Sequence, residues 1–181
     1  MNNFKTFIDT KDTEKINAFY KAGFYASNIM YIMEKEQEPL RKTKDLEDFN
    51  VSVYDTGDLT EYLKANGRGF GTPDPIEKIE GDLEKPMSRI YVYRKNGKIV
   101  SSVTVWDEPD GALATENIFT DPKHRGKGYA TAVLLTALND AYKRGVMKAR
   151  LTVYYTDIEA ITMYYKFGYK ITRVLQEFRH E

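Results

Sequence analysis

Around residue 125 the sequence changes from the two-residue alternation of a β-strand to the longer period of an α-helix. The stretch 112–119 has strand character and leads into a turn that contains Gly126 and Gly128. Beyond the turn, small and apolar side chains recur on one helical face, at Ala130, Val133, Leu134, Ala137, Leu138 and Ala141. A strand that runs through a glycine turn into a long amphipathic helix predicts a mixed α/β layer architecture.

Shorter patterns predict the elements on either side of this unit. Residues 89–94 and 98–106 flank the pair Asn96-Gly97, and Asn-Gly is the strongest short signal of a β-hairpin. Alternation predicts further strands, and capping residues and glycines mark where helices begin and end. Strands are expected at 49–54, 112–119, 148–155 and 169–178, and helices at 58–63 (ended by Gly67), 75–83 and 157–167 (ended by Gly168). The predicted fold class is α/β, a mixed central sheet flanked by helices.

The beginning of the chain resembles its end. Residues 11–25 match 156–170 at Asp12/Asp157, Glu14/Glu159, Ile16/Ile161, Tyr20/Tyr165, Lys21/Lys166 and Gly23/Gly168. Strand-like stretches at 4–8 and 27–33 flank the first copy. We interpret residues 1–36 as an extra, non-catalytic strand–helix–strand, 37–48 as a connection and 49–181 as the main domain. The extra element needs a partner surface, either the edge of the main sheet or the same element of a second copy in a homodimer.

Composition narrows the class of function. The 27 basic and 27 acidic residues cancel, which disfavours a general nucleic-acid binder. The absence of cysteine excludes disulfides and thiolate ligands, and two histidines leave little basis for a metal site. No apolar run approaches the roughly 20 residues that span a bilayer, and the first residues do not resemble a signal peptide. These features predict a soluble, cytoplasmic protein without metal.

The glycine turn is also where chemistry is expected. The first amides of a helix have no partner within it and carry the positive end of the dipole, so they suit a pyrophosphate. Arg125 and Lys127 add positive charge. The pattern is neither a Walker A loop nor Gly-x-Gly-x-x-Gly, because position 131 is Thr. From the residues alone, a plain glycine turn with solvated basic side chains remains the alternative.

Two motifs together resemble the GNAT superfamily of acyl-CoA-dependent N-acyltransferases. Its signature Arg/Gln-x-x-Gly-x-Gly/Ala is met by Arg125, Gly128 and Ala130. A second motif, Ala-x-x-x-Tyr-x-x-x-Gly-Phe/Tyr, is met by Ala160, Tyr164, Gly168 and Tyr169. The resemblance covers about residues 49–178 and implies a GNAT-like fold, with residues 1–36 like the tail of a second, truncated GNAT unit.

The resemblance also implies roles for individual residues. The strand backbone at Ile118, Phe119 and Thr120 would pair with the pantetheine arm of acetyl-CoA. Tyr164 would protonate the leaving thiolate, or else be a core aromatic. Glu116 is the candidate base by position, or else an ordinary strand-end carboxylate. Asp157, where many relatives have Asn, is expected as a helix N-cap. The pyrophosphate site would comprise Arg125, Gly126, Lys127, Gly128, Tyr129, Ala130 and Thr131.

The implied function is N-acetyltransfer from acetyl-CoA to a primary amine, on a small molecule or a protein, by direct attack. Two alternatives remain: a CoA-binding module or sensor without transfer, and a toxin that acetylates aminoacyl-tRNA. The zero net charge argues against the second of these. The loop at 55–88 is expected to set the acceptor.

Overall fold

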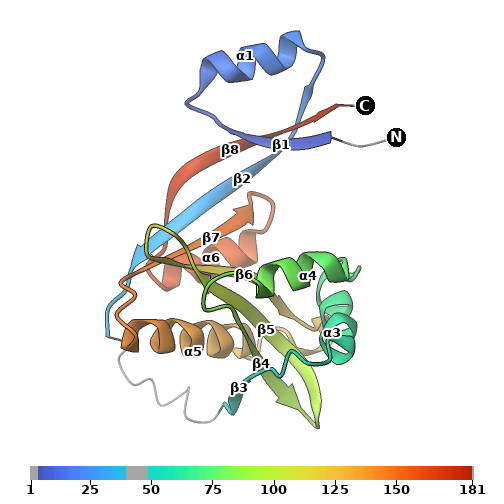
Figure 1. Ribbon diagram of the computed structural model, residues 1–181, viewed down its shortest axis with the longest axis vertical. Helices are drawn as coiled ribbons and strands as arrows, with labels where there is room; N and C mark the ends of the chain where they lie inside the picture. The colour runs from blue at the N-terminus through green and yellow to red at the C-terminus, as the bar shows by residue number, and fades with distance from the viewer. Residues whose placement is uncertain (1–3, 40–48, 181) are drawn as a thin grey trace. The chain divides into compact units, whose positions relative to one another are not determined.

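The computed structural model describes residues 4–39 and 49–180, and these residues fall into two compact units. One unit combines the described residues up to Lys35 with those from Arg150 onward, and the other extends from Glu36 to Ala149. In both, strands are flanked by helices, so the predicted α/β class is confirmed (Figure 1). From position 40 onward the predicted connection lies outside the described residues, and the predicted domain limits stay a prediction.

Four antiparallel strands form the framework of the second unit, in the order β6-β5-β4-β3. They are β3 (Val51–Val53), β4 (Arg89–Lys95), β5 (Lys98–Asp107) and β6 (Ala112–Thr120). Asn96 and Gly97 have φ angles of 50° and 76°. Positive φ at both positions gives the tight turn between β4 and β5 that the Asn-Gly pair predicts.

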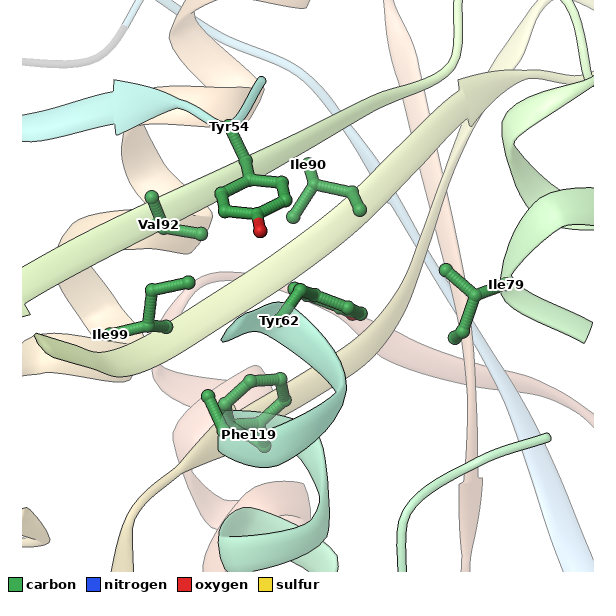
Figure 2. Packing of buried hydrophobic residues seen from close by; sticks show 8 residues of the cluster. Tyr54, Tyr62, Ile79, Ile90, Val92, Ile99 and Phe119 are labelled. Atoms are coloured by element: carbon green, nitrogen blue, oxygen red, sulfur yellow. The ribbon is translucent and has the colours of Figure 1, made fainter. Parts of the chain in front are cut away.

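Helices cover both faces of these four strands. On one face, α3 (Thr60–Phe70) and α4 (Ile76–Leu83) enclose a buried cluster. Its members include Tyr54, Tyr62, Ile79, Ile90, Val92, Ile99 and Phe119 (Figure 2). On the other face, Tyr91 of β4 donates a 3.0 Å hydrogen bond to Asp140 of α5 (Tyr129–Lys143). Since Tyr91 lies between Ile90 and Val92, alternate residues of β4 serve the two faces.

The end of α3 is the one helix limit that the sequence analysis misplaces clearly. The helix begins near the predicted site, where the Asp58 side chain accepts a 2.8 Å hydrogen bond from the amide of Thr60. It does not stop at Gly67 but continues to Phe70 and ends at Gly71, whose φ is 85°. The left-handed conformation that ends a helix is adopted by Gly71 and not by Gly67.

The first unit is organised around β8 (Lys170–His180), which pairs antiparallel with β1 (Phe4–Asp9) on one side and β2 (Tyr25–Glu36) on the other. β7 (Lys148–Tyr154) follows β2 in the strand order. The helices are α1 (Thr13–Lys21) and α6 (Ile158–Lys166). The fully buried Phe178 ring lies 5.7 Å from that of Phe19 and 5.1 Å from that of Tyr20, both on α1. The N-terminal segment thus pairs with β8 of its own chain; elements not discussed above lie within a few residues of their predicted limits.

Candidate functional site

The glycine turn before α5 leaves the start of that helix open. Gly128 is the N-cap of α5 with a φ of 80°, and no side chain caps the helix there. Gly126 also has a positive φ, 72°. Backbone conformation rather than crowding requires glycine here, because a Cβ on Gly126 would meet nothing within 4 Å. Residues 126–131 form the glycine turn and the first residues of α5, where the leading helix amides have no partner inside the helix. Their binding of a pyrophosphate stays a prediction.

The Arg125 side chain holds this turn through two hydrogen bonds to backbone carbonyls. Its Nε donates a 3.3 Å hydrogen bond to the carbonyl oxygen of Thr120, and its Nη2 donates a 3.1 Å bond to that of Gly69. The guanidinium therefore ties the end of β6 and the end of α3 to the loop. Lys127 is exposed, so its ammonium is accessible from solvent.

Asp121 fixes the path of the chain between β6 and α5. Its buried carboxylate accepts 3.0 Å hydrogen bonds from the amide of Lys123 and from Nε of Arg68. Burial alone would raise the pKa of Asp121, but these two hydrogen bonds outweigh it and hold the pKa below its usual value. The charged carboxylate therefore anchors the turn, and Arg68 is a contributor that the sequence analysis missed.

The predicted binding residues at the end of β6 make strand pairs, hydrogen bonds and core contacts within the protein. Phe119 lies opposite Ser102 of β5, and Thr120 lies opposite Ser101. The Ser101 hydroxyl donates a 2.9 Å hydrogen bond to the Phe119 carbonyl and lies 2.9 Å from the Thr120 hydroxyl. Phe119 is buried in the α3–α4 cluster, whereas Ile118 and Thr120 are half-buried. Their pairing with a pantetheine arm stays a prediction.

A β-bulge interrupts β6 next to Glu116. Thr104 of β5 lies opposite Glu116, and Ser102 lies opposite Phe119. One residue of β5 therefore faces two of β6, Asn117 and Ile118. The Thr104 hydroxyl lies 3.3 Å from the Tyr62 hydroxyl of α3, and antiparallel partners share a face, so half-buried Glu116 is on the α3 face.

Asn117 is the second residue that sequence reasoning missed. Its φ of 51° is left-handed, a conformation in which Asn is one of the few non-glycine residues found often. Its Oδ1 accepts a 3.1 Å hydrogen bond from Nζ of Lys78, and its Nδ2 donates a 3.2 Å bond to Oδ2 of Asp82. Both partners are on α4, so the bulge is bonded to that helix. An Asn inside an otherwise regular strand pattern was the available signal.

Tyr164 lies in the other unit, on α6. It is buried, and its ring centroid is 5.9 Å from that of Tyr169. After α6, Gly168 adopts a left-handed φ of 84°, and the amide of Tyr169 donates a 3.1 Å hydrogen bond to the Tyr164 carbonyl. These two features end the helix. The second motif is thus a helix that ends at a left-handed glycine, with buried Tyr164 on the helix and buried Tyr169 directly after the glycine.

Asp157 occupies the N-cap position of α6, as expected, but its side chain makes no capping hydrogen bond. The equivalent residue of α1, Asp12, does cap its helix by accepting a 3.0 Å bond from the amide of Lys15. Asp157 is therefore at the N-cap position that the sequence analysis expected, although its side chain does not bond to the helix. The two matched segments differ at this carboxylate.

Within residues 4–39 and 49–180, no cluster of three or more acidic, His or Cys side chains is placed to bind a metal ion. None of the helices in these ranges is long and apolar enough to cross a membrane.

The chain is similar in sequence to known acetyltransferases. The model of the acetyltransferase (GNAT) family matches residues 56–169. Glucosamine 6-phosphate N-acetyltransferase from Trypanosoma brucei brucei is 22% identical over 139 residues, which cover 70% of this chain and 92% of that enzyme.

Solved structures show the same fold at low identity. A GCN5-related N-acetyltransferase from Sphaerobacter thermophilus matches with a TM-score of 0.79 and 19% identity, over 99% of this chain and 59% of that one. The chain therefore spans less than two thirds of that relative. The ribosomal-protein-S18-alanine N-acetyltransferase of Escherichia coli matches with a TM-score of 0.62 and 18% identity, over 72% of this chain and 91% of that one.

Proposed function

Because the chain belongs to the acetyltransferase (GNAT) family, we propose that it transfers an acetyl group from acetyl-CoA to a primary amine. The observation that carries the proposal is the uncapped start of α5 behind Gly128. A pyrophosphate there would accept hydrogen bonds from the turn and helix amides of residues 126–131. The exposed side chain of Lys127 adds positive charge to the same end of the helix.

The residues present fit this co-substrate. Left-handed glycines at 126 and 128 leave no Cβ at these two positions of the turn before α5. Arg125 supports the loop through backbone carbonyls, so its part in binding is to hold the turn in place as well as to supply charge. Acetyl-CoA brings an acyl group on a thioester, whose thiolate is a good leaving group.

In the reaction we propose, Glu116 acts as the base and Tyr164 as the acid. The amine nitrogen bonds to the carbonyl carbon of the thioester, and Glu116 accepts the proton that the nitrogen loses. The carbon–sulfur bond breaks, and the Tyr164 hydroxyl gives its proton to the sulfur. Exchange with water returns both side chains to their starting states. Support comes from the half-buried position of Glu116 on the α3 face and from the motif that holds Tyr164.

Two relatives suggest which acceptors to examine first. The trypanosomal relative is named for an amino sugar phosphate, and the Escherichia coli structure for an alanine of ribosomal protein S18. We propose glucosamine 6-phosphate as the first acceptor to test, because its enzyme matches this chain in sequence over 92% of that enzyme's length, whereas the Escherichia coli protein matches in fold.

The function is tested by measuring free thiol released from acetyl-CoA with a panel of acceptors. The panel contains glucosamine 6-phosphate, glucosamine, spermidine and a peptide with an N-terminal alanine. Thiol release with one of them, together with mass spectrometry of the acetylated product, supports the proposal. Tight acetyl-CoA binding without release on any acceptor favours the alternative, a CoA-binding module.

The cofactor site has its own test in Gly128→Asp. This change places a negative charge at the start of α5, so acetyl-CoA affinity measured by calorimetry should fall at least about tenfold. Gly71→Asp is the matched control, because Gly71 also has a positive φ, 85°, and also lies at a helix end. Equal affinities of folded Gly128→Asp and Gly71→Asp would refute the proposed pyrophosphate site.

A further inference from the structure

We propose that Asn117 is a positioning residue that determines on which face of the sheet the Glu116 carboxylate lies. This inference rests on the proposed function only in that Glu116 is the base there. The bulge gives the first reason. Glu116 and Phe119 are three residues apart, and in a regular strand such residues point to opposite faces.

Here both lie on the same face. Phe119 packs against Tyr62, with ring centroids 5.9 Å apart, and Glu116 is opposite Thr104, whose hydroxyl is 3.3 Å from that of Tyr62. The extra residue in β6 produces this arrangement. Without it, a one-residue change of register would move Glu116 to the α5 face while Phe119 keeps its place in the core.

The second reason is that the bulge is held from α4 through Asn117. Lys78 and Asp82 are four residues apart, so they lie on one face of α4. Lys78 donates a hydrogen bond to the oxygen of the Asn117 side-chain amide, and Asp82 accepts one from its nitrogen. The Asp82 side chain is buried, and its other oxygen accepts a 2.7 Å hydrogen bond from Lys85. Lys78 in turn donates a 2.9 Å bond to Asp74.

These bonds restrain a side chain whose backbone is in the left-handed conformation. The amide of Asn117 therefore does more than stabilise α4, because it fixes the residue next to Glu116. Loss of the two bonds should move the carboxylate without unfolding the protein.

Three variants separate the backbone from the side chain. Asn117→Gly keeps the left-handed conformation and removes both bonds. Asn117→Asp removes the donor to Asp82 and places two carboxylates together. The exchange Asn117→Asp with Asp82→Asn restores one donor and one acceptor in the opposite order. Asn96→Gly is the matched control, since Asn96 has a φ of 50° in the same sheet and lies in the β4–β5 turn.

Two readouts are needed, and the first requires no acceptor. The side-chain carboxyl resonance of Glu116 is followed by ¹³C NMR, with Glu116→Gln to assign it. We expect it to shift in Asn117→Gly and Asn117→Asp, to return in the exchanged pair, and to stay unchanged in Asn96→Gly.

The second readout is turnover with an acceptor from the panel. Misplaced reacting groups cost roughly 10- to 100-fold, so kcat should fall by that factor in Asn117→Gly and recover in the exchanged pair. Acetyl-CoA affinity by calorimetry should not change. A purely structural role would instead lower stability and leave kcat of the folded enzyme intact.

An unchanged Glu116 resonance in folded Asn117→Gly overturns the inference. So does a kcat that does not recover in the exchanged pair while the resonance does. If no acceptor releases thiol, the proposed function fails, yet the resonance still decides whether Asn117 positions Glu116.

Discussion

Glu177 of β8 offers a sharp test of what holds the N-terminal segment in place. Its side chain is fully buried and accepts a 2.7 Å hydrogen bond from Ser27 of β2 and another of 2.7 Å from Arg179. Tyr154 of β7 donates a bond of 2.9 Å, and Lys5 of β1 lies at 3.1 Å. One carboxylate therefore connects β1, β2 and β7 to β8.

The size of its contribution follows from its acidity. Burial alone would raise the pKa of Glu177, but the hydrogen bonds from Ser27, Arg179, Tyr154 and Lys5 lower it to about 2, from an ordinary 4.5. At neutral pH that difference contributes about 3 kcal/mol to the free energy of unfolding. For a chain of this size, it corresponds to roughly 6–12 °C in Tm.

The pH dependence has a definite sign. A carboxylate whose folded pKa is lowered stabilises the protein fully above its unfolded pKa of 4.5, and loses that effect as the pH falls toward 2. Glu177→Gln should therefore lower Tm strongly at pH 7, and by less than about half as much at pH 3.

The measurement is thermal unfolding of the wild type and Glu177→Gln at pH 7 and pH 3. Asp9→Asn is the matched control, because Asp9 pairs with Arg173 across the same two strands, β1 and β8, where the pair is exposed to solvent. Its effect on Tm should be much smaller. A Glu177→Gln protein that melts with the wild type at pH 7, or a difference that does not shrink at pH 3, would show that this reasoning is wrong.

Three further predictions concern other parts of the chain. Tyr164→Phe should keep acetyl-CoA affinity and lose about 10²–10⁴-fold in kcat, whereas full turnover would make Tyr164 a packing residue. Gly69→Ala should lower stability by about 1–3 kcal/mol in thermal unfolding, because a Cβ there would lie 2.7 Å from Phe119; Gly81→Ala, with nothing within 4 Å, should not. Deletion of residues 1–36 removes both strands that pair with β8, so solubility or Tm should fall, and equal stability with an unchanged oligomeric state would contradict it.

Much of the fold was predictable because local chemistry determines it. The Asn96-Gly97 pair requires a tight hairpin, and the apolar face of residues 130–141 requires a buried helix. The end of α3 was not predictable in the same way. Gly67 and Gly71 look alike in the sequence, and only the tertiary structure decides which of them adopts the left-handed conformation that ends the helix.

In the candidate site, too, local features could be predicted from the sequence and features that depend on tertiary structure could not. The loop at 125–131 was found because its glycines, charges and helix start are contiguous. The bulge was not, because it depends on the register between β5 and β6, which no local pattern specifies. Consequently the sequence pointed to Glu116 but gave no reason for the face on which it lies. Asn117 is far along the chain from Lys78 and Asp82, so its bonds to them could only be seen in the structure.

α1 and α6 show how far the resemblance between the two ends of the chain extends. Gly23 and Gly168 have φ angles of 86° and 84°, and each follows a nine-residue helix. The amides of Phe24 and Tyr169 bond to the carbonyls of Phe19 and Tyr164 at 3.0 and 3.1 Å. Any helix that stops at a left-handed glycine can form these bonds, so they do not by themselves establish a duplication, which stays a prediction.

The side chains separate the two segments more clearly than the backbone does. Where α6 has Tyr164, α1 has Phe19, which has no hydroxyl to donate a proton. The Phe19 ring instead lies 4.7 Å from that of Phe24 and 5.7 Å from that of Phe178. Since Phe178 is fully buried on β8, the aromatic residue of α1 serves to cover that strand. The same pattern of a helix followed by a glycine is thus compatible with a packing role for the aromatic residue of α1. For the tyrosine of α6 it is compatible, as we propose, with proton transfer.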